Sequence, residues 1–219
     1  MGTEIDLMIN YPKPKRNVDE RGATKTEEDR LLARKFGKDF FDGDRKNGYG
    51  GFSYFSRFWQ PVIPTFQKHW NLDSTSSVLD VGCAKGFMMH DFAELIPGIT
   101  VKGIDISEYA IENAIEDMKP HVQVGNALSL PFDDKSFDVI ISVTTLHNLE
   151  REECAIALQE IERVSRKGAF ITVDAYRNEE EKERMYNWNL TAKTIMSVEE
   201  WKVFFKQVGY TGDYYWFIP

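Results

Sequence analysis

The 219-residue chain is 42% hydrophobic and 13% aromatic, which supplies apolar surface for one large core and excludes a disordered protein. Its formal net charge is −8, and no apolar run approaches the about 18 residues that a membrane-spanning helix needs. Residues 71–219 carry 14 basic and 25 acidic side chains, and a body this acidic argues against a nucleic-acid partner. Residues 1–70 carry 13 basic and 10 acidic side chains; this surplus either faces a small anionic substrate or belongs to solvated helix faces.

Cysteine content and the start of the chain indicate the compartment. Cys83 and Cys154 are too few for a disulfide framework and are expected to be free thiols in a reducing environment. The first residues lack the basic and apolar regions of a secretory signal. We therefore predict a cytoplasmic protein with no membrane partner and no metal site.

The first 76 residues are predicted to form an N-terminal extension. Residues 1–22, with two prolines and mixed charges, are expected to form an extended arm. Thr26 followed by Asp29 is a weak helix-capping pattern, which predicts a helix that ends near residue 40. Residues 40–59 hold four glycines and eight aromatic residues and predict an ordered loop, which leads into a helix over 57–70 with Pro61 near its start.

From residue 77 onward, short β-rich apolar runs alternate with helical ones. Strands are predicted at 77–81, 100–105, 122–125, 138–142, 169–175 and 214–218, and helices at 87–95, 107–118, 151–166 and from Ser197 to about Gly209. This alternation predicts a doubly wound α/β fold, a mostly parallel Rossmann-like sheet with helices on both faces. Residues 178–184 are expected to form a surface helix or a lid.

The first predicted strand runs into a glycine-containing loop, Val78-Leu-Asp-Val-Gly-Cys-Ala-Lys-Gly-Phe87. Small residues at Gly82, Ala84 and Gly86 allow a tight turn and a close approach to a ligand at a helix N-terminus. A dinucleotide fingerprint needs its third small residue where Phe87 stands, so the spacing does not fit one. The loop instead resembles the first motif of class I S-adenosylmethionine-dependent methyltransferases of the type 11 group, an acid followed by G-x-G-x-G.

The later motifs of that family follow in order over residues 77–176. Asp105 ends the second strand, where the family's carboxylate accepts from both ribose hydroxyls. Asn126 replaces the aspartate that contacts adenine in the family, and its amide oxygen is still an acceptor. The resemblance implies S-adenosylmethionine as cofactor, S-adenosylhomocysteine as product, and a cofactor site made of Asp80, Gly82, Cys83, Ala84, Gly86, Phe87, Asp105, Ile106, Asn126, Ala127 and Ser142.

The C-terminal end departs from the family. Its sheet usually finishes with an antiparallel pair of strands, but only one predicted strand follows Gly209 here. Residues 190–196, before the last helix, are the candidate for its partner. Residues 77–219 are thus expected to form the cofactor-binding domain, and residues 1–76 a cap over the acceptor site.

The fourth motif gives the first indication of the acceptor. Ser142-Val-Thr-Thr145 lacks the Asn/Asp-Pro-Pro-aromatic sequence that suggests nucleobase amino groups as acceptors. A hydroxyl acceptor needs a nearby base, whereas an amine needs only to be neutral. His147, just past the fourth strand, is the catalytic candidate as that base, and loop packing is its alternative role.

The N-terminal extension is expected to supply the acceptor site, since the sheet is used for the cofactor. Tyr49, between glycines, is a catalytic and substrate-binding candidate, and Arg57 could pair with phosphate, although most aromatics of this loop are expected to be core. Lys85 either reaches an anionic group or is a solvated lysine. Residues 36–51 resemble the N-terminal stretch of small bacterial methyltransferases that modify surface polysaccharides and sugars.

The sequence therefore predicts a methyltransferase acting on a small molecule, by O-methylation of a sugar, sugar phosphate or nucleotide sugar. N-methylation of an amino sugar or another small metabolite is the alternative within enzymes. A non-catalytic module that binds S-adenosylmethionine is the alternative outside them. The expected partner is a small-molecule acceptor, with an anionic acceptor and a homodimer left open.

Overall fold

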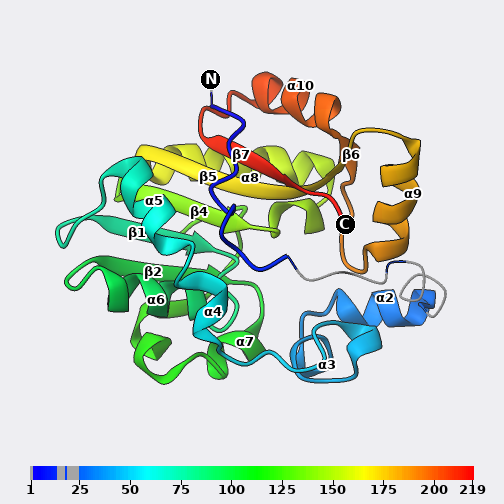
Figure 1. Ribbon diagram of the computed structural model, residues 1–219, viewed down its shortest axis with the longest axis horizontal. Helices are drawn as coiled ribbons and strands as arrows, with labels where there is room; N and C mark the ends of the chain where they lie inside the picture. Colours follow the sequence, from blue (N-terminus) through cyan, green and yellow to red (C-terminus); the bar gives the residue numbers. More distant parts are fainter. Residues whose placement is uncertain (1, 14–17, 19–24) are drawn as a thin grey trace.

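One parallel sheet organises the molecule, and the computed structural model describes it over residues 2–13, 18 and 25–219 (Figure 1). Its strand order is β3-β2-β1-β4-β5, with β6 and β7 both paired with β5, and every pairing is parallel. The strands are β1 (Ser77–Val81), β2 (Thr100–Asp105), β3 (Val122–Val124), β4 (Phe137–Val143), β5 (Ser165–Tyr176), β6 (Met196–Ser197) and β7 (Asp213–Phe217). The predicted doubly wound α/β fold is confirmed.

Helices cover both faces of the sheet. The described helices are α2 (Glu27–Ala33), α3 (Lys38–Phe41), α4 (Ser56–Trp59), α5 (Ile63–Trp70), α6 (Phe87–Leu95), α7 (Glu108–Glu112), α8 (Arg151–Val164), α9 (Glu179–Trp188) and α10 (Val198–Val208). Three 3-10 turns lie in the connections of the described part: η1 (Arg45–Asn47), η2 (Glu116–His121) and η3 (Leu146–Asn148). None of the described helices is long and apolar enough to span a lipid bilayer.

Alternation along the central strands builds two cores. Leu79 and Val81 of β1 pack on one face of the sheet, in the core that includes α8 and α10. Val78 of the same strand packs on the opposite face, in the core that includes α5 and α6. Neighbouring residues of a strand point to opposite faces, so a run of apolar residues can fill both layers. Leu7, Ile63 and Phe66 belong to the second core, so the N-terminal extension shares its interior with the sheet.

Three predicted helices are shorter than expected, each at an identifiable interruption. The helix predicted to end near residue 40 stops at Ala33, because Phe36 adopts a left-handed φ of +49° and the chain restarts as α3. The helix over 57–70 divides into α4 and α5 around Pro61, which has no N–H to continue the ladder. The helix over 107–118 ends after one turn and continues as η2, which contains Pro120.

The C-terminal edge differs from the family pattern. β7 pairs with β5 in parallel, because α10 crosses over between β6 and β7 and returns the chain in the same direction. The predicted partner segment 190–196 supplies only the start of β6, at Met196. The N-terminal arm adds to this edge: the N–H of Ile5 donates to the Tyr214 carbonyl, and that of Tyr214 donates to the Thr3 carbonyl.

The N-terminal segment then closes over the carboxyl ends of the strands. Helices α2 and α3 lie there, on the same side as α9 (Figure 1). The ammonium of Lys25 donates to the carbonyls of residues 187–189, and Arg30 donates to the Asn189 carbonyl at 2.7 Å. Basic side chains thus satisfy carbonyl groups at the C-terminus of α9, which ties the extension to the segment after that helix.

Candidate active site

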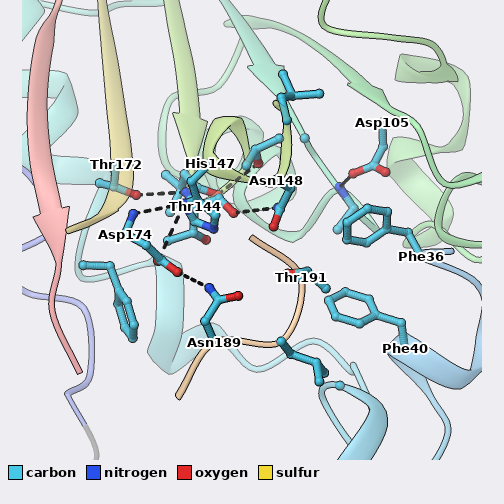
Figure 2. Close-up of a pocket in the computed structure, with 18 of the residues that line it drawn as sticks. Phe36, Phe40, Asp105, Thr144, His147, Asn148, Thr172, Asp174, Asn189 and Thr191 are labelled. Carbon is cyan, nitrogen blue, oxygen red and sulfur yellow. Dashed lines mark hydrogen bonds and ion pairs between the residues drawn. The ribbon is translucent and has the colours of Figure 1, made fainter. Parts of the chain in front are cut away.

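A large cleft runs along the carboxyl ends of the strands, where ligands bind in open parallel sheets. Its volume is about 1320 Å³. The sheet forms its floor. Its walls are formed by the N-terminal arm, by residues 34–46 from the end of α2 to η1 (the α2–η1 segment), and by residues 188–193. Figure 2 shows Phe36 on the same side of the cleft as Asp105, and Phe40 next to Thr191, away from the group around His147. The cleft therefore has one half at the ends of β1 to β3 and another at the ends of β4, β5 and β7.

Part of the glycine loop lines the first half of the cleft, through Gly82 and Ala84, and the backbone of the loop explains its composition. Gly82 has a φ of +88°, and a Cβ placed there would lie 2.1 Å from Oγ1 of Thr145. Ala84 adopts a φ of +47°, so the residue that replaces the family's middle glycine carries a left-handed backbone. Gly86 is the N-cap of α6, with a φ of +78°. The loop turns tightly at all three positions, and Gly82 admits no side chain.

Asp105 and Asp80 place two carboxylates beneath this loop. Asp105 accepts from the backbone N–H groups of Ala84 and Ser107, both at 2.8 Å. Burial raises the pKa of Asp105, although these backbone hydrogen bonds oppose the rise. Asp80 is 5% exposed, and burial followed by the nearby Asp105 charge raises its pKa well above the usual range. In the described part of the chain, no group hydrogen-bonds to the Asp80 carboxylate.

The two carboxylates and the backbone amides of the loop fit a cationic ligand that carries hydroxyl groups. Two close carboxylates, one of them without a partner among the described residues, are stabilised by an adjacent positive charge. The backbone amides of a loop at the start of α6 can receive a polar or anionic group. Ile106, which lines the cleft and is 55% exposed, offers apolar surface for a planar ring. S-adenosylmethionine combines these features.

The predicted cofactor residues divide into two groups. Those that line the cleft are Gly82, Ala84, Asp105, Ile106, Asn126 and Ala127. Those that lie behind its surface are Asp80, Cys83, Gly86, Phe87 and Ser142. Ser142 is fully buried, and its hydroxyl donates to the Val81 carbonyl at 2.8 Å, which joins β4 to β1. Phe87 stacks on Phe52 with a centroid distance of 5.0 Å.

The predicted acceptor residues also divide. Tyr49 and His147 line the cleft, whereas Arg57 and Lys85 do not. The Arg57 guanidinium lies over the rings of Phe55 and Phe58, at 5.3 and 5.1 Å from their centroids. The ring centroids of Tyr49 and Phe52 are 4.4 Å apart, and Tyr49 remains 44% exposed. The aromatic residues of this loop therefore pack mainly against one another, and the Tyr49 ring stays accessible to a ligand.

Lys85 holds the extension against the glycine loop. Its side chain is buried, and its ammonium donates to Asp42 at 2.6 Å and to the Phe52 carbonyl at 2.9 Å. Tyr109 also donates to Asp42, at 2.8 Å. Burial alone would raise the pKa of Asp42, but hydrogen bonds from Lys85, Phe52 and Tyr109 hold that pKa below its usual range. Lys85 thus has a structural role in holding the extension, and its ammonium does not face the cleft.

Replacing Lys85 by methionine is expected to lower the free energy of unfolding by about 2–3 kcal/mol, because it leaves a part-buried carboxylate without its cation. The measurement is urea denaturation of Lys85→Met, Asp42→Asn and the double variant, with exposed Lys38→Met as the control. The double variant should lose clearly less free energy of unfolding than the sum of the losses in the two single variants. Strict additivity would show that the two side chains do not stabilise each other.

Sequence reasoning missed the polar residues of the second half of the cleft. Thr144, Asn148, Thr172, Asp174 and Asn189 all line it, and Figure 2 shows them around His147. Thr144 adopts a φ of +50°, unusual for a β-branched residue, and its N–H donates to the carbonyl and the hydroxyl of Thr172. A polar residue at the carboxyl end of a parallel strand was the available signal for Thr172 and Asp174. Asn189 comes from beyond α9 and had no such signal.

Basic side chains dominate the charge of the cleft. Among the described residues, seven basic side chains line it, from the arm, the segment from α2 to η1 and the loops after β5 and α9: Lys13, Arg34, Lys35, Arg45, Lys46, Arg177 and Lys193. Four acidic residues of the described part line it as well, Asp6, Asp105, Glu153 and Asp174. Asp105 and Asp174 are largely enclosed by hydrogen bonds with protein groups. A cationic cleft in a chain of net charge −8 favours anionic ligands.

A cluster of metal-ligating groups lies outside the cleft, on α6. His90, Asp91 and Glu94 bring ligand atoms within 4.8 Å of one another. Each already has a protein partner: His90 contacts Asp117 at 2.6 Å, Asp91 accepts from Tyr54 at 2.6 Å, and Glu94 accepts from Gln60 at 3.4 Å. Oδ2 of Asp91 is buried and has no hydrogen-bond partner in the described part of the chain.

Comparison with known proteins agrees with the geometry of the first half of the cleft. The methyltransferase-domain family model matches residues 72–213. A tRNA (carboxymethyluridine(34)-5-O)-methyltransferase from Arabidopsis thaliana is 33% identical over 145 residues, which cover 64% of this chain and 33% of that protein. A demethylmenaquinone methyltransferase from Roseiflexus castenholzii is 32% identical over 101 residues, covering 45% of this chain and 42% of that protein.

Solved structures agree as well. The crystal structure of the MccD protein has a TM-score of 0.55 and 26% identity, and the match covers 66% of this chain and 68% of that one. The matched segments span less than half the length of the two curated relatives, which are longer than the part that resembles this chain. The range matched by the family model, residues 72–213, contains β1 to β6 and the glycine loop.

Proposed function

Because the chain belongs to the family of S-adenosylmethionine-dependent methyltransferase domains, we propose that it methylates a small anionic acceptor, by O-methylation of a sugar or sugar phosphate. The cofactor supplies a methyl group on a sulfonium sulfur, which keeps the electron pair of the broken bond. The chain's own residues then have to hold both partners in line and exclude competing water.

We assign the first half of the cleft to the cofactor. Asp105 would accept from the ribose hydroxyls, and Asn126 from the adenine amino group. The backbone turn from Gly82 to Gly86 would receive the methionine part, with Asp80 beneath it as counter-charge. The aromatic rings of Phe36 and Phe40 line the cleft on the side of Asp105, so they would shield the cofactor from bulk water there (Figure 2).

The observation that carries the acceptor assignment is the charge of the cleft walls. Of the described residues that line the cleft, seven are basic and four are acidic, in a protein whose net charge is −8. Lys35 is exposed at the cleft, and Lys193 and Arg177 contact only exposed or half-buried carboxylates, at 3.4 and 3.5 Å. Such side chains can turn to a phosphate or carboxylate with little loss, because exposed ion pairs contribute little.

An RNA acceptor is the second candidate, on the similarity to the tRNA methyltransferase. The net charge of −11 on residues 71–219 disfavours it, because a polyanion would meet repulsion outside the cleft. N-methylation of an amine and a non-catalytic binding module also remain alternatives to the proposal. We keep a cytoplasmic location, a homodimer and the division of the chain at residue 76 as proposals; the two free cysteines support the first.

The test uses methyl-labelled S-adenosylmethionine, the purified protein, and source-cell extract separated into small-molecule, RNA and protein pools. Label is expected in the small-molecule pool, in a product that binds an anion exchanger. Label in RNA or protein would overturn the acceptor assignment and leave the cofactor intact. Cofactor binding with no label in any pool would favour the binding module.

A further inference from the structure

His147 is held in a fixed orientation at the junction of β4, β5 and the loop after α9. It lies in η3, and its carbonyl accepts from the backbone N–H groups of Lys193 and Thr194, both at 3.0 Å. Its ring nitrogen Nδ1 lies 3.0 Å from the backbone nitrogen of Asp174 (Figure 2). A backbone N–H can only donate, so Nδ1 accepts and carries no proton. The proton of the neutral ring is therefore on Nε2.

The ring is held neutral in a buried position at the edge of the cleft. His147 is 4% exposed, and burial lowers its pKa, against the opposing effect of Asp174, whose Oδ1 lies 3.6 Å from Nδ1. No hydrogen-bond partner of Nε2 is found among residues 2–13, 18 and 25–219. His147 lines the cleft. A base would need a lone pair on Nε2, and this geometry places a proton there instead.

Asn148, the next residue in the chain, carries an unsatisfied acceptor. Its Nδ2 is oriented toward the Thr144 carbonyl, at 3.5 Å, which turns Oδ1 the other way. Oδ1 is buried and has no hydrogen-bond partner in the described part of the chain. An unsatisfied buried acceptor costs about 1–3 kcal/mol, so a ligand that donates to it gains affinity. Asn148 also lines the cleft.

We infer that His147 is a fixed hydrogen-bond donor in the reaction rather than a base, and that with Asn148 it selects a hydroxyl group as the methyl acceptor. This inference rests on the proposed function and specifies the chemistry of its acceptor site. A hydroxyl donates to Oδ1 of Asn148, accepts from Nε2–H of His147, and keeps one lone pair for attack. An amine has a single lone pair, which the Nε2–H would occupy. A phosphate oxygen without a proton has nothing to donate.

The reaction balances without a protein base. The free lone pair of the hydroxyl oxygen forms the C–O bond as the S–C bond breaks toward sulfur. Once the C–O bond has formed, the methylated oxygen carries a positive charge, and its proton leaves to a water molecule that enters from the open side of the cleft. The anionic group of the acceptor is held elsewhere, by the basic walls.

The first test compares His147→Gln with His147→Leu in the labelled-extract assay. A glutamine amide can accept from the Asp174 N–H and donate into the cleft, but it cannot act as a base. The inference predicts that His147→Gln keeps at least about a tenth of the wild-type rate and that His147→Leu loses at least about a hundredfold. Both variants must retain cofactor binding and a cooperative thermal transition. Equal inactivity of the two, or wild-type rates in both, would overturn the donor role.

The second test does not depend on activity. Nitrogen-15 NMR of histidine-labelled protein at pH 7.5, assigned with His147→Gln, reports which ring nitrogen carries the proton. The expected spectrum shows a protonated Nε2 and an unprotonated Nδ1 for His147. A proton on Nδ1, or on both nitrogens, contradicts the inference. If the wild-type protein transfers no label but shows the Nε2–H form, the proposed function fails while the donor geometry of His147 stands.

Discussion

Replacing Asp105 by alanine is expected to weaken S-adenosylmethionine binding by at least about a hundredfold. A carboxylate that accepts from two ribose hydroxyls makes two hydrogen bonds of about 1.5–3 kcal/mol each, because the acceptor is charged. The fold should persist, since β2 pairs with β1 and β3 through its backbone. The measurement is calorimetric titration of the purified variant with the cofactor.

Asp105 also accepts from Ala84 and Ser107, so its loss loosens the loop to some extent. Circular dichroism and thermal unfolding separate this effect from lost binding. The exposed Asp133→Ala is the matched control and should bind like wild type. Unchanged affinity in a folded Asp105→Ala would remove the ribose assignment.

Replacing Asp80 by asparagine is expected to stabilise the cofactor-free protein while weakening cofactor binding at least tenfold. The Asp80 carboxylate is buried near Asp105, and both burial and that charge raise its pKa. At pH 7.5 the wild-type protein must keep an ionised carboxylate in an unfavourable environment or protonate it. Asparagine removes this cost, so the free energy of unfolding should rise by about 1–3 kcal/mol.

The pH dependence follows from the direction of that pKa. A carboxyl group whose pKa is higher in the folded state stabilises the protein most at low pH, and this contribution is lost as the pH rises toward the folded value. The stability difference between wild type and Asp80→Asn should therefore vanish below about pH 4. Cofactor affinity of the wild type should fall in acid, because protonation removes the counter-charge. A variant less stable than wild type at pH 7.5 would contradict this account.

Local rules account for what could be predicted from the sequence. The capping box of Ser197 and Glu200 and the left-handed Gly209 set the ends of α10 as expected, because both signals act within one helical turn. The glycine loop and Asp105 were found because tight turns and strand ends demand particular residue types at fixed spacing. The central strands followed from apolar runs bounded by turns.

Contacts between distant segments decided the rest. Lys85 pairs with Asp42, 43 positions earlier in the chain, and no local pattern distinguishes such a lysine from a solvated one. The second half of the cleft combines the ends of β4, β5 and β7 with the arm and the loop after α9, so Thr172, Asp174 and Asn189 meet only after folding. The parallel direction of β7 depends on where α10 crosses the sheet.

By itself, the sequence determined the parallel fold and the tight turn of the glycine loop, because sterics and periodicity act over consecutive residues. Only the tertiary structure decided which nitrogen of His147 holds the proton, since the Asp174 N–H that fixes it comes from the next strand. It also decided that Gly82 faces Thr145 and that the walls of the cleft are basic. Those properties depend on three-dimensional proximity, which residue types and spacing do not encode.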